Sequence, residues 1–211
     1  MDVHDLLTKD KYSLGMVMPL IEGTSWKEKL RKELQANNGR LSNKQVRKHI
    51  DFLLKVCQAI SYAHHRGILH NDIKTENVMV GDFGDVVVMD WGCATQNPST
   101  DIDLPFRILH PKQIQNPFGS PCYMSPEMAK GVGTDIGPWT DSYLLGAVLY
   151  EIIEGREPRQ EKDVITIIEQ ACNGEYDSFE ACSSPTLLQI CQKALSPNIA
   201  DRYQSPDEFE Q

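Results

Sequence analysis

The sequence predicts an α+β protein that is mostly helical and begins with a short β-hairpin. Two segments near the N-terminus, residues 3–8 and 12–20, are rich in strand-forming residues and flank the turn Lys9-Asp10-Lys11. Much of the remaining chain instead repeats apolar residues at helical spacing, as between Val46 and Ile60. With 211 residues, 40% of them hydrophobic, the chain can form one globular domain or a large part of one.

Capping signals place the first two helices. Ser25 is expected to cap a helix over residues 26–36, which the turn-forming residues 37–39 end. Ser42 and Gln45 form a capping box for a long helix that ends near residue 67.

Two groups of charged or titratable residues on these helices are expected to serve only the helices themselves. The basic residues from Lys27 to Lys32 are interleaved with Glu28 and Glu33, which is typical of a solvated helix face. His64 and His65 lie at the end of the long helix, where a positive charge is favoured by the helix dipole.

The second half of the chain continues with a second hairpin and then several helices. Two apolar runs, residues 78–80 and 86–89, flank the turn residues 81–85. Residues 91–126 have little periodicity, and an irregular segment of that length inside a compact domain is usually functional. Helices are then expected over residues 141–154, 163–171 and 185–194, with a further one that begins at Ser205 and breaks off near Gln211.

Charge and cysteine use exclude several classes of protein. The net charge of -9 argues against nucleic acid or an anionic membrane as the main partner. The longest apolar stretch, residues 143–153, contains Glu151 and is too short to span a bilayer, and the acidic N-terminus is unlike a signal peptide. Six cysteines without a C-x-x-C pair are expected to be reduced and mostly buried, as in a cytoplasmic protein.

The segment from His70 to Asn77, HNDIKTEN, brings together side chains suited to moving a phosphoryl group. Asp72 can orient a hydroxyl, and Lys74 can neutralise charge on the transferred group. Asn77 and Asp90, an amide and a carboxylate, are typical ligands of Mg²⁺.

The second hairpin is expected to bring the two metal ligands together. If its turn is centred between Phe83 and Gly84, residues whose numbers sum to 167 face each other, and Asn77 faces Asp90. Asp82-Phe83-Gly84 would then lie at the far end of the hairpin and serve only as its turn.

These motifs resemble those of the eukaryotic-type serine/threonine protein kinases, in order along the whole chain. HNDIKTEN is similar to the H-R-D-L-x-x-x-N catalytic loop, and Asp90-Trp91-Gly92 to the D-F-G motif. Gly119 to Glu127 resembles the end of an activation loop, and Asp141 begins a segment like the helix that supports the catalytic loop. Arg202 stands where this family has the partner of Glu127.

The resemblance implies a nucleotide site at the start of the chain. Met18 would hold the gatekeeper position, and the main chain of Pro19 and Ile21 would face the adenine. Ser25 is included among the nucleotide contacts, and Met79 would form the floor under the base. ATP and Mg²⁺, or Mn²⁺ in its place, are the cofactors that the resemblance implies, and proteins with Ser or Thr acceptors are the substrates.

The resemblance also divides the chain. Residues 1–24 would be the remnant of the N-terminal lobe and the hinge, and residues 25–211 the C-terminal lobe of a kinase-like fold. Within the latter, residues 70–77 form the catalytic loop and 90–127 the activation segment, and the last helix is truncated. No Gly-rich loop and no V-A-x-K strand occur in the sequence, so the missing lobe is expected upstream.

Three functional hypotheses remain. The chain is part of an active Ser/Thr kinase, or a catalytically inactive C-terminal lobe that binds proteins. A small-molecule phosphotransferase of the aminoglycoside type shares the H-x-D-x-x-x-x-N pattern, but Lys74 and the peptide-recognition segment around Glu127 disfavour it.

Regulation is expected to differ from that of most relatives. Asn71 replaces the Arg that usually pairs with a phosphorylated activation loop, so phosphate at Ser99 or Thr100 would lack its partner. Ser120 should instead hydrogen bond beside Asp72 and Lys74.

Overall fold

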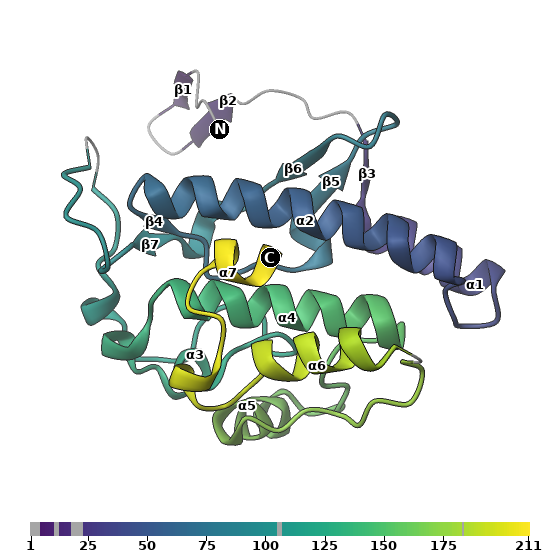
Figure 1. Cartoon of the computed structure of the whole chain (residues 1–211). Helices are drawn as coiled ribbons and strands as arrows, with labels where there is room; N and C mark the ends of the chain where they lie inside the picture. The colour runs from purple at the N-terminus through teal and green to yellow at the C-terminus, as the bar shows by residue number, and fades with distance from the viewer. Residues whose placement is uncertain (1–4, 11–12, 18–22, 105–106, 183) are drawn as a thin grey trace.

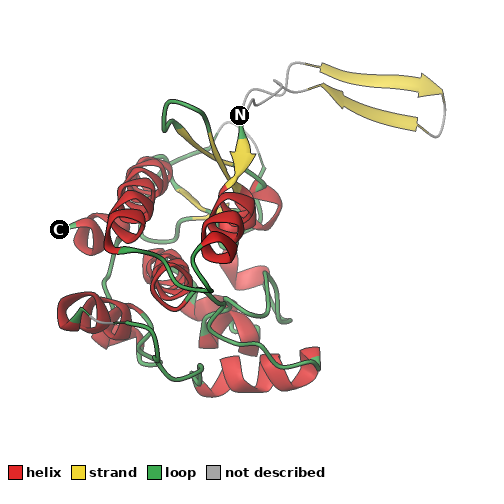
Figure 2. Ribbon diagram, turned by 90° about the vertical axis from the view of Figure 1, so that its right-hand side faces the viewer, coloured by secondary structure: helices red, strands yellow, loops and turns green. Residues whose placement is uncertain are grey.

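The computed structural model describes residues 5–10, 13–17, 23–104, 107–182 and 184–211, and it shows a mostly helical protein with three small sheets (Figures 1 and 2). The α-helices are α1 (Trp26–Ala36), α2 (Asn43–His65), α3 (Pro126–Lys130), α4 (Pro138–Glu154), α5 (Val164–Asn173), α6 (Pro185–Ala194) and α7 (Pro206–Glu210). The strands are β1 (Asp5–Asp10), β2 (Ser13–Val17), β3 (Thr24–Ser25), β4 (Ile68–Leu69), β5 (Val78–Val80), β6 (Val86–Val88) and β7 (Thr95–Gln96). Short 3₁₀ turns occupy Thr75–Asn77, Trp91–Cys93, Pro111–Gln113, Gly133–Asp135 and Ile199–Asp201.

The N-terminal hairpin is confirmed as an antiparallel pair, β1 with β2. Its first strand continues through Lys9 to Asp10, which we expected in the turn. The reason is a shift of register between Thr8 and Asp10, which lets Asp10 pair with Ser13.

Helix α4 forms the centre of the core. All its residues except Trp139 are buried, so the helix is covered on every side, as expected for one that is apolar all round. Helices α2, α6 and α7 pack against it (Figure 1). The helix begins at Pro138, three residues before the predicted start, because a proline suits the first turn of a helix.

The predicted caps are present at both early helices. The Ser25 hydroxyl accepts a hydrogen bond from the Glu28 N–H at the start of α1. At α2, Ser42 and Gln45 form the capping box in both directions. Ser205 likewise caps α7, which packs on α2 and α4.

The second hairpin, β5 with β6, has a register one residue away from the predicted one. Val78 pairs with Val88 and Val80 with Val86, so paired numbers sum to 166. Three residues, Asp82 to Gly84, form the loop, and Gly84 has a φ of 79°, the left-handed conformation that such three-residue loops require. Asn77 therefore lies opposite Met89, whose N–H donates to the Asn77 carbonyl at 2.8 Å, and the prediction that it faces Asp90 is wrong.

Part of the long irregular segment forms a strand that the sequence pattern did not indicate. β7 pairs with β4, just before the catalytic loop, and Thr95 also bridges to Leu109. The Asn97 N–H donates to the Gly67 carbonyl at 2.7 Å and extends this attachment. The segment that follows Asp90 is thereby fixed beside residues 70–77.

Candidate active site

A buried carboxylate holds the catalytic loop in place. Asp141, at the start of α4, is fully buried and accepts hydrogen bonds from the main-chain N–H groups of His70 and Asn71, both at 2.8 Å. The His64 Nε2 lies 2.7 Å from the same carboxylate. Burial alone would raise the pKa of Asp141, but the hydrogen bond and charge of His64 outweigh it, and the pKa lies below its ordinary value. The expected role of this helix under the catalytic loop is confirmed.

His64 is therefore more than a helix-end residue. Its side chain is buried and turned toward Asp141, so the prediction that it serves only the end of α2 is wrong. His65 lies on the exposed side, with its Nδ1 2.8 Å from the Ser61 carbonyl. Asp141, the partner of His64, is 77 residues away in the sequence, so the helical periodicity of α2 could not predict this contact.

His70 is a buried strut between the catalytic loop and the second hairpin. Its Nδ1 accepts a hydrogen bond from the Asp72 N–H at 3.2 Å, and its Nε2 lies 3.1 Å from the Met89 carbonyl. These two contacts require the neutral ring with its proton on Nε2. Burial lowers the pKa of His70 and so favours this neutral form. Met89, the residue before Asp90, is thus tied to His70, two residues before Asp72.

Asp72, Lys74 and Asn77 form one connected group. Asp72 Oδ2 accepts from the Lys74 ammonium and from the Asn77 amide, each at 3.0 Å. The amide of Asn77 also donates to the Asp72 main-chain carbonyl at 2.9 Å, and Lys74 reaches Ser120 Oγ at 2.5 Å. Among the described residues no donor contacts Asp72 Oδ1, so this oxygen can receive a hydroxyl.

The donor set at Asn77 and Asp90 fits a magnesium ion. The amide nitrogen of Asn77 is committed to Asp72, so its carbonyl oxygen is the end that can ligate a cation. Asp90 is exposed and has a φ of 57°, and one of its oxygens accepts from the Gly92 N–H at 3.3 Å. Within the described ranges no cluster of three or more His, Cys, Asp or Glu side chains could hold a metal by itself. Two hard ligands of this kind suit a cation that takes its other oxygens from nucleotide phosphates and water.

The turn of the second hairpin lies apart from this group. Asp82 and Phe83 are exposed at the tip, and the Phe83 side chain is fully accessible. Three residue pairs of the β5–β6 ladder separate the tip from Asn77. The alternative Asp-Phe-Gly sequence is therefore a loop, as predicted.

Of the predicted nucleotide contacts, two lie in the described part of the chain. Ser25 and Met79 are paired across β3 and β5, so the two residues lie next to each other in one sheet. The Ser25 hydroxyl also caps α1. Met18, Pro19 and Ile21 lie outside the described residues.

Asn71 makes structural contacts that the sequence did not indicate, since the sequence showed only that asparagine stands where arginine was expected. It is fully buried with a φ of 61°, a left-handed conformation that asparagine tolerates better than most residues. Its amide donates to Thr95 Oγ1 at 2.9 Å and to the Cys93 carbonyl at 3.2 Å. Asn71 thus attaches the segment after Asp90 directly to the catalytic loop.

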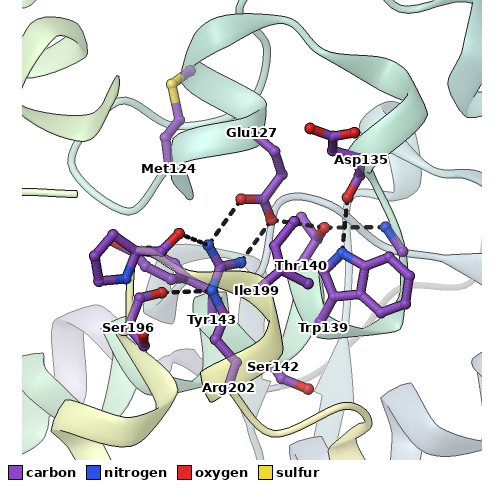
Figure 3. A network of polar contacts seen from close by, with 12 residues as sticks. Met124, Glu127, Asp135, Trp139, Thr140, Ser142, Tyr143, Ser196, Ile199 and Arg202 are labelled. Carbon is purple, nitrogen blue, oxygen red and sulfur yellow. Dashed lines mark hydrogen bonds and ion pairs between the residues drawn. The ribbon is translucent and has the colours of Figure 1, made fainter. Parts of the chain in front are cut away.

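Glu127 and Arg202 form the predicted pair. Two parallel contacts join them, Nη1 to Oε1 at 2.7 Å and Nη2 to Oε2 at 2.9 Å, and both side chains are buried (Figure 3). Thr140 Oγ1 donates to the same carboxylate, and Arg202 Nε donates to the Ser196 carbonyl. The pair ties α3 to the segment before α7.

Lys27 lies in a cluster of carboxylates beside the catalytic loop, contrary to the prediction of a solvated face. Its ammonium contacts Glu151 at 2.5 Å, Glu157 at 2.6 Å and Glu76 at 3.5 Å. Burial would lower the pKa of Lys27, but the charge of Glu151 outweighs it and the pKa is raised. Lys32 keeps the character expected of the helix surface, since it is exposed and pairs with the half-exposed Glu28.

The cysteines are free thiols. Cys57 and Cys191 are buried, whereas the other four are only partly buried, so the expectation that most are buried holds for two of them (93, 122, 172 and 182 are the partly buried ones). Burial raises the pKa of the Cys122 thiol to about 11. The Cys122 thiol is therefore protonated at neutral pH.

Comparison with known proteins agrees with the motifs. The model of the protein kinase domain family matches residues 3–210. The chain is 31% identical over 209 residues to the serine/threonine-protein kinase PknD of Protochlamydia amoebophila, covering 91% of this chain and 21% of that protein. It is 30% identical over 236 residues to PknD of Chlamydia trachomatis serovar L2b and 31% identical over 219 residues to PknD of Chlamydia felis. These alignments cover 97% and 96% of this chain, and 24% and 23% of the relatives.

The chain thus spans about a fifth to a quarter of the length of these curated relatives. Every helix in the described part of the chain is too short or too polar to span a bilayer.

Proposed function

Because the chain belongs to the protein kinase domain family, we propose that it transfers the γ-phosphoryl group of ATP to Ser or Thr hydroxyls of protein substrates. The observation that carries the proposal is the arrangement around Asp72. One of its carboxylate oxygens is held by Lys74 and Asn77, and the other receives no donor from the described residues. A carboxylate fixed in this way can orient an incoming hydroxyl and accept its proton.

Each of the other residues has a role that follows from its contacts. Lys74 lies between Asp72 and Ser120, where its charge can stabilise the negative charge of the transferred group. Asn77 and Asp90 would hold the magnesium ion, which neutralises phosphate charge when bound. In this proposal Ser25 and Met79, with Met18, Pro19 and Ile21, line the nucleotide site.

The proposal extends to the organisation of the chain. Residues 25–211 would supply the catalytic loop and the loop that meets the substrate, and residues 1–24 the end of the smaller lobe and the hinge. The preference for Ser and Thr over Tyr is supported by Lys74 and its contact with Ser120. A cytoplasmic location, where ATP and reduced thiols coexist, is part of the proposal.

The test is transfer of labelled γ-phosphate to a degenerate Ser/Thr peptide library by the whole protein. We expect phosphoserine and phosphothreonine products, and we expect Asp72→Asn to reduce turnover by about 10²–10⁴-fold with unchanged thermal stability. Asp82→Asn, at the tip of the hairpin, is the matched control and should stay within about twofold of the parent, well below the change of a catalytic group. A parent protein that binds peptides but transfers no phosphate would favour a binding module instead.

A further inference from the structure

Arg159, in the segment between α4 and α5, is a fully buried cation. None of the described carboxylates lies within 4.0 Å of its guanidinium, whereas buried charges in proteins are usually paired. Arg159 does not contact Asp72, Lys74, Asn77 or Asp90.

Its partners are neutral oxygens from three parts of the fold. Nη1 donates to the Met124 carbonyl at 3.0 Å and, more weakly, to the Cys122 carbonyl at 3.4 Å. Nη2 donates to the Tyr143 hydroxyl at 2.7 Å and Nε to the Glu175 carbonyl at 2.7 Å. The two carbonyls on Nη1 belong to one short loop, residues 119–125, which we call the acceptor loop.

The acceptor loop is also held from its other side. The Tyr123 hydroxyl donates to Glu151 Oε2 at 2.7 Å, and the Thr75 hydroxyl of the catalytic loop donates to the same oxygen at 2.9 Å. Glu151 is buried in α4. Arg159 thus hydrogen bonds to the main chain on either side of Tyr123, and Glu151 hydrogen bonds to the Tyr123 side chain.

The other end of the acceptor loop lies against the catalytic group. The N–H groups of Tyr123 and Met124 both donate to the Ser120 carbonyl at 3.0 Å, so residues 120–124 form one compact turn. Ser120 accepts from Lys74, and a side-chain carbon at Gly119 would lie 3.8 Å from Asp72 Oδ1 and 3.1 Å from the Asn71 carbonyl. The acceptor loop therefore lies next to Asp72 Oδ1, the oxygen that can receive a hydroxyl.

We propose that Arg159 is a positioning residue that fixes the acceptor loop in the shape that receives the substrate peptide beside Asp72. This inference rests on the proposed function. The Arg159 guanidinium donates to three carbonyls and a hydroxyl at once, which exceeds the three donors of a lysine ammonium. Loss of the Arg159 hydrogen bonds should weaken peptide binding and leave the chemical step and the nucleotide site nearly unchanged.

The experiment compares Arg159→Gln with Arg156→Gln in the whole protein. Arg156 is the matched control: it bonds to Asp177 and to the Ser178 carbonyl, in the same neighbouring segment as Glu175, and does not touch the acceptor loop. Two readouts are measured, hydrogen–deuterium exchange of residues 119–125 and steady-state kinetics with the library peptide that the parent phosphorylates best.

We expect Arg159→Gln to speed amide exchange in residues 119–125 and to raise the KM for peptide about tenfold, with kcat and the KM for ATP within about threefold, the pattern of lost uniform binding. Arg156→Gln should change neither. Arg159→Lys, which keeps the charge, should give exchange rates and a peptide KM between those of the parent and of Arg159→Gln. The Lys variant replaces the Gln variant in the test if the latter does not fold.

Unchanged exchange in the acceptor loop, equal effects of both Gln variants, a Lys variant equal to the parent in exchange, or a fall in kcat at constant peptide KM would each overturn the role. The exchange readout needs no catalysis. A parent without transfer activity would defeat the proposed function alone, and exchange would still decide the role of Arg159.

Discussion

Individual polar side chains attach the segment after Asp90 to the rest of the fold. Asn71 of the catalytic loop holds this segment through Thr95, and Asn97 attaches it to the end of α2 through the carbonyls of His64 and Gly67. Ser99 is exposed, and its N–H donates to the Asn97 side chain. The described contacts come from neutral side chains and main-chain groups, in keeping with Asn71 at the position where arginine would be expected to hold a phosphate.

Ser120→Glu should therefore inactivate the protein. The new carboxylate would lie beside Lys74 and draw its ammonium away from Asp72, with repulsion between the two acids. We expect at least a 10²-fold loss of peptide phosphorylation, the scale of losing a positioned catalytic group. Ser99→Glu and Ser99→Ala, in the same segment, should retain near-parent activity, and a protein that is silent until Ser99 is phosphorylated would contradict the account.

The contact between α1 and α2 contains a buried histidine. Trp26 Nε1 donates to His49 Nδ1 at 2.7 Å, and the opposite ring nitrogen lies 3.4 Å from Glu33. Burial lowers the pKa of His49, with Glu33 opposing and Lys48 adding to the shift. The neutral ring is the form that fits between Trp26 and Glu33, because a proton on Nδ1 would meet the Trp26 N–H.

A folded pKa below the unfolded value means that unfolding takes up a proton at this residue. Stability should therefore fall as pH drops from 7 toward 5, starting near the ordinary histidine pKa of about 6.5. His49→Leu should show a smaller loss over that range in urea unfolding followed at each pH. Equal pH dependence in parent and variant would exclude His49 as a contributor.

The elements differ in how far the sequence could predict them. The capping box of α2 and the group of Asp72, Lys74 and Asn77 follow from residues only a few positions apart, so spacing was sufficient. The hairpin register was missed by one residue because a three-residue loop with a left-handed Gly84 replaced the expected even-numbered turn. The roles of Lys27, His64 and Arg159 depend on partners in other elements, and no local pattern encodes those partners.

Two buried acidic residues of α4 join the functional loops to the core of the whole protein. Asp141 holds the catalytic loop, and Glu151 joins that loop to the acceptor loop and to α1. Both lie on α4, which packs against α2, α6 and α7 and is buried at every residue except Trp139. The site therefore depends on the stability of the helical core.

Removal of the ion pair between Glu127 and Arg202 should lower the stability of the helical core. Glu127→Ala would leave Arg202 buried without its carboxylate, which costs roughly 3–5 kcal/mol, a large part of the stability of a domain. We expect a strongly reduced free energy of unfolding in urea. Glu28→Ala, which breaks an exposed pair with Lys32, should change it little, and a similar small change for Glu127→Ala would mean that the pair does not support the fold.

We propose that Asn77 and Asp90, rather than Asp82, form a metal–nucleotide site beside Asp72. Titration of the whole protein with Mn²⁺, with and without ATP, tests it through paramagnetic broadening of assigned NMR signals. We predict weak broadening with Mn²⁺ alone and stronger broadening with ATP, centred on Asn77 and Asp90 and lost in Asp90→Asn but not in Asp82→Asn. Broadening centred on Asp82, or unchanged in Asp90→Asn, would contradict the account.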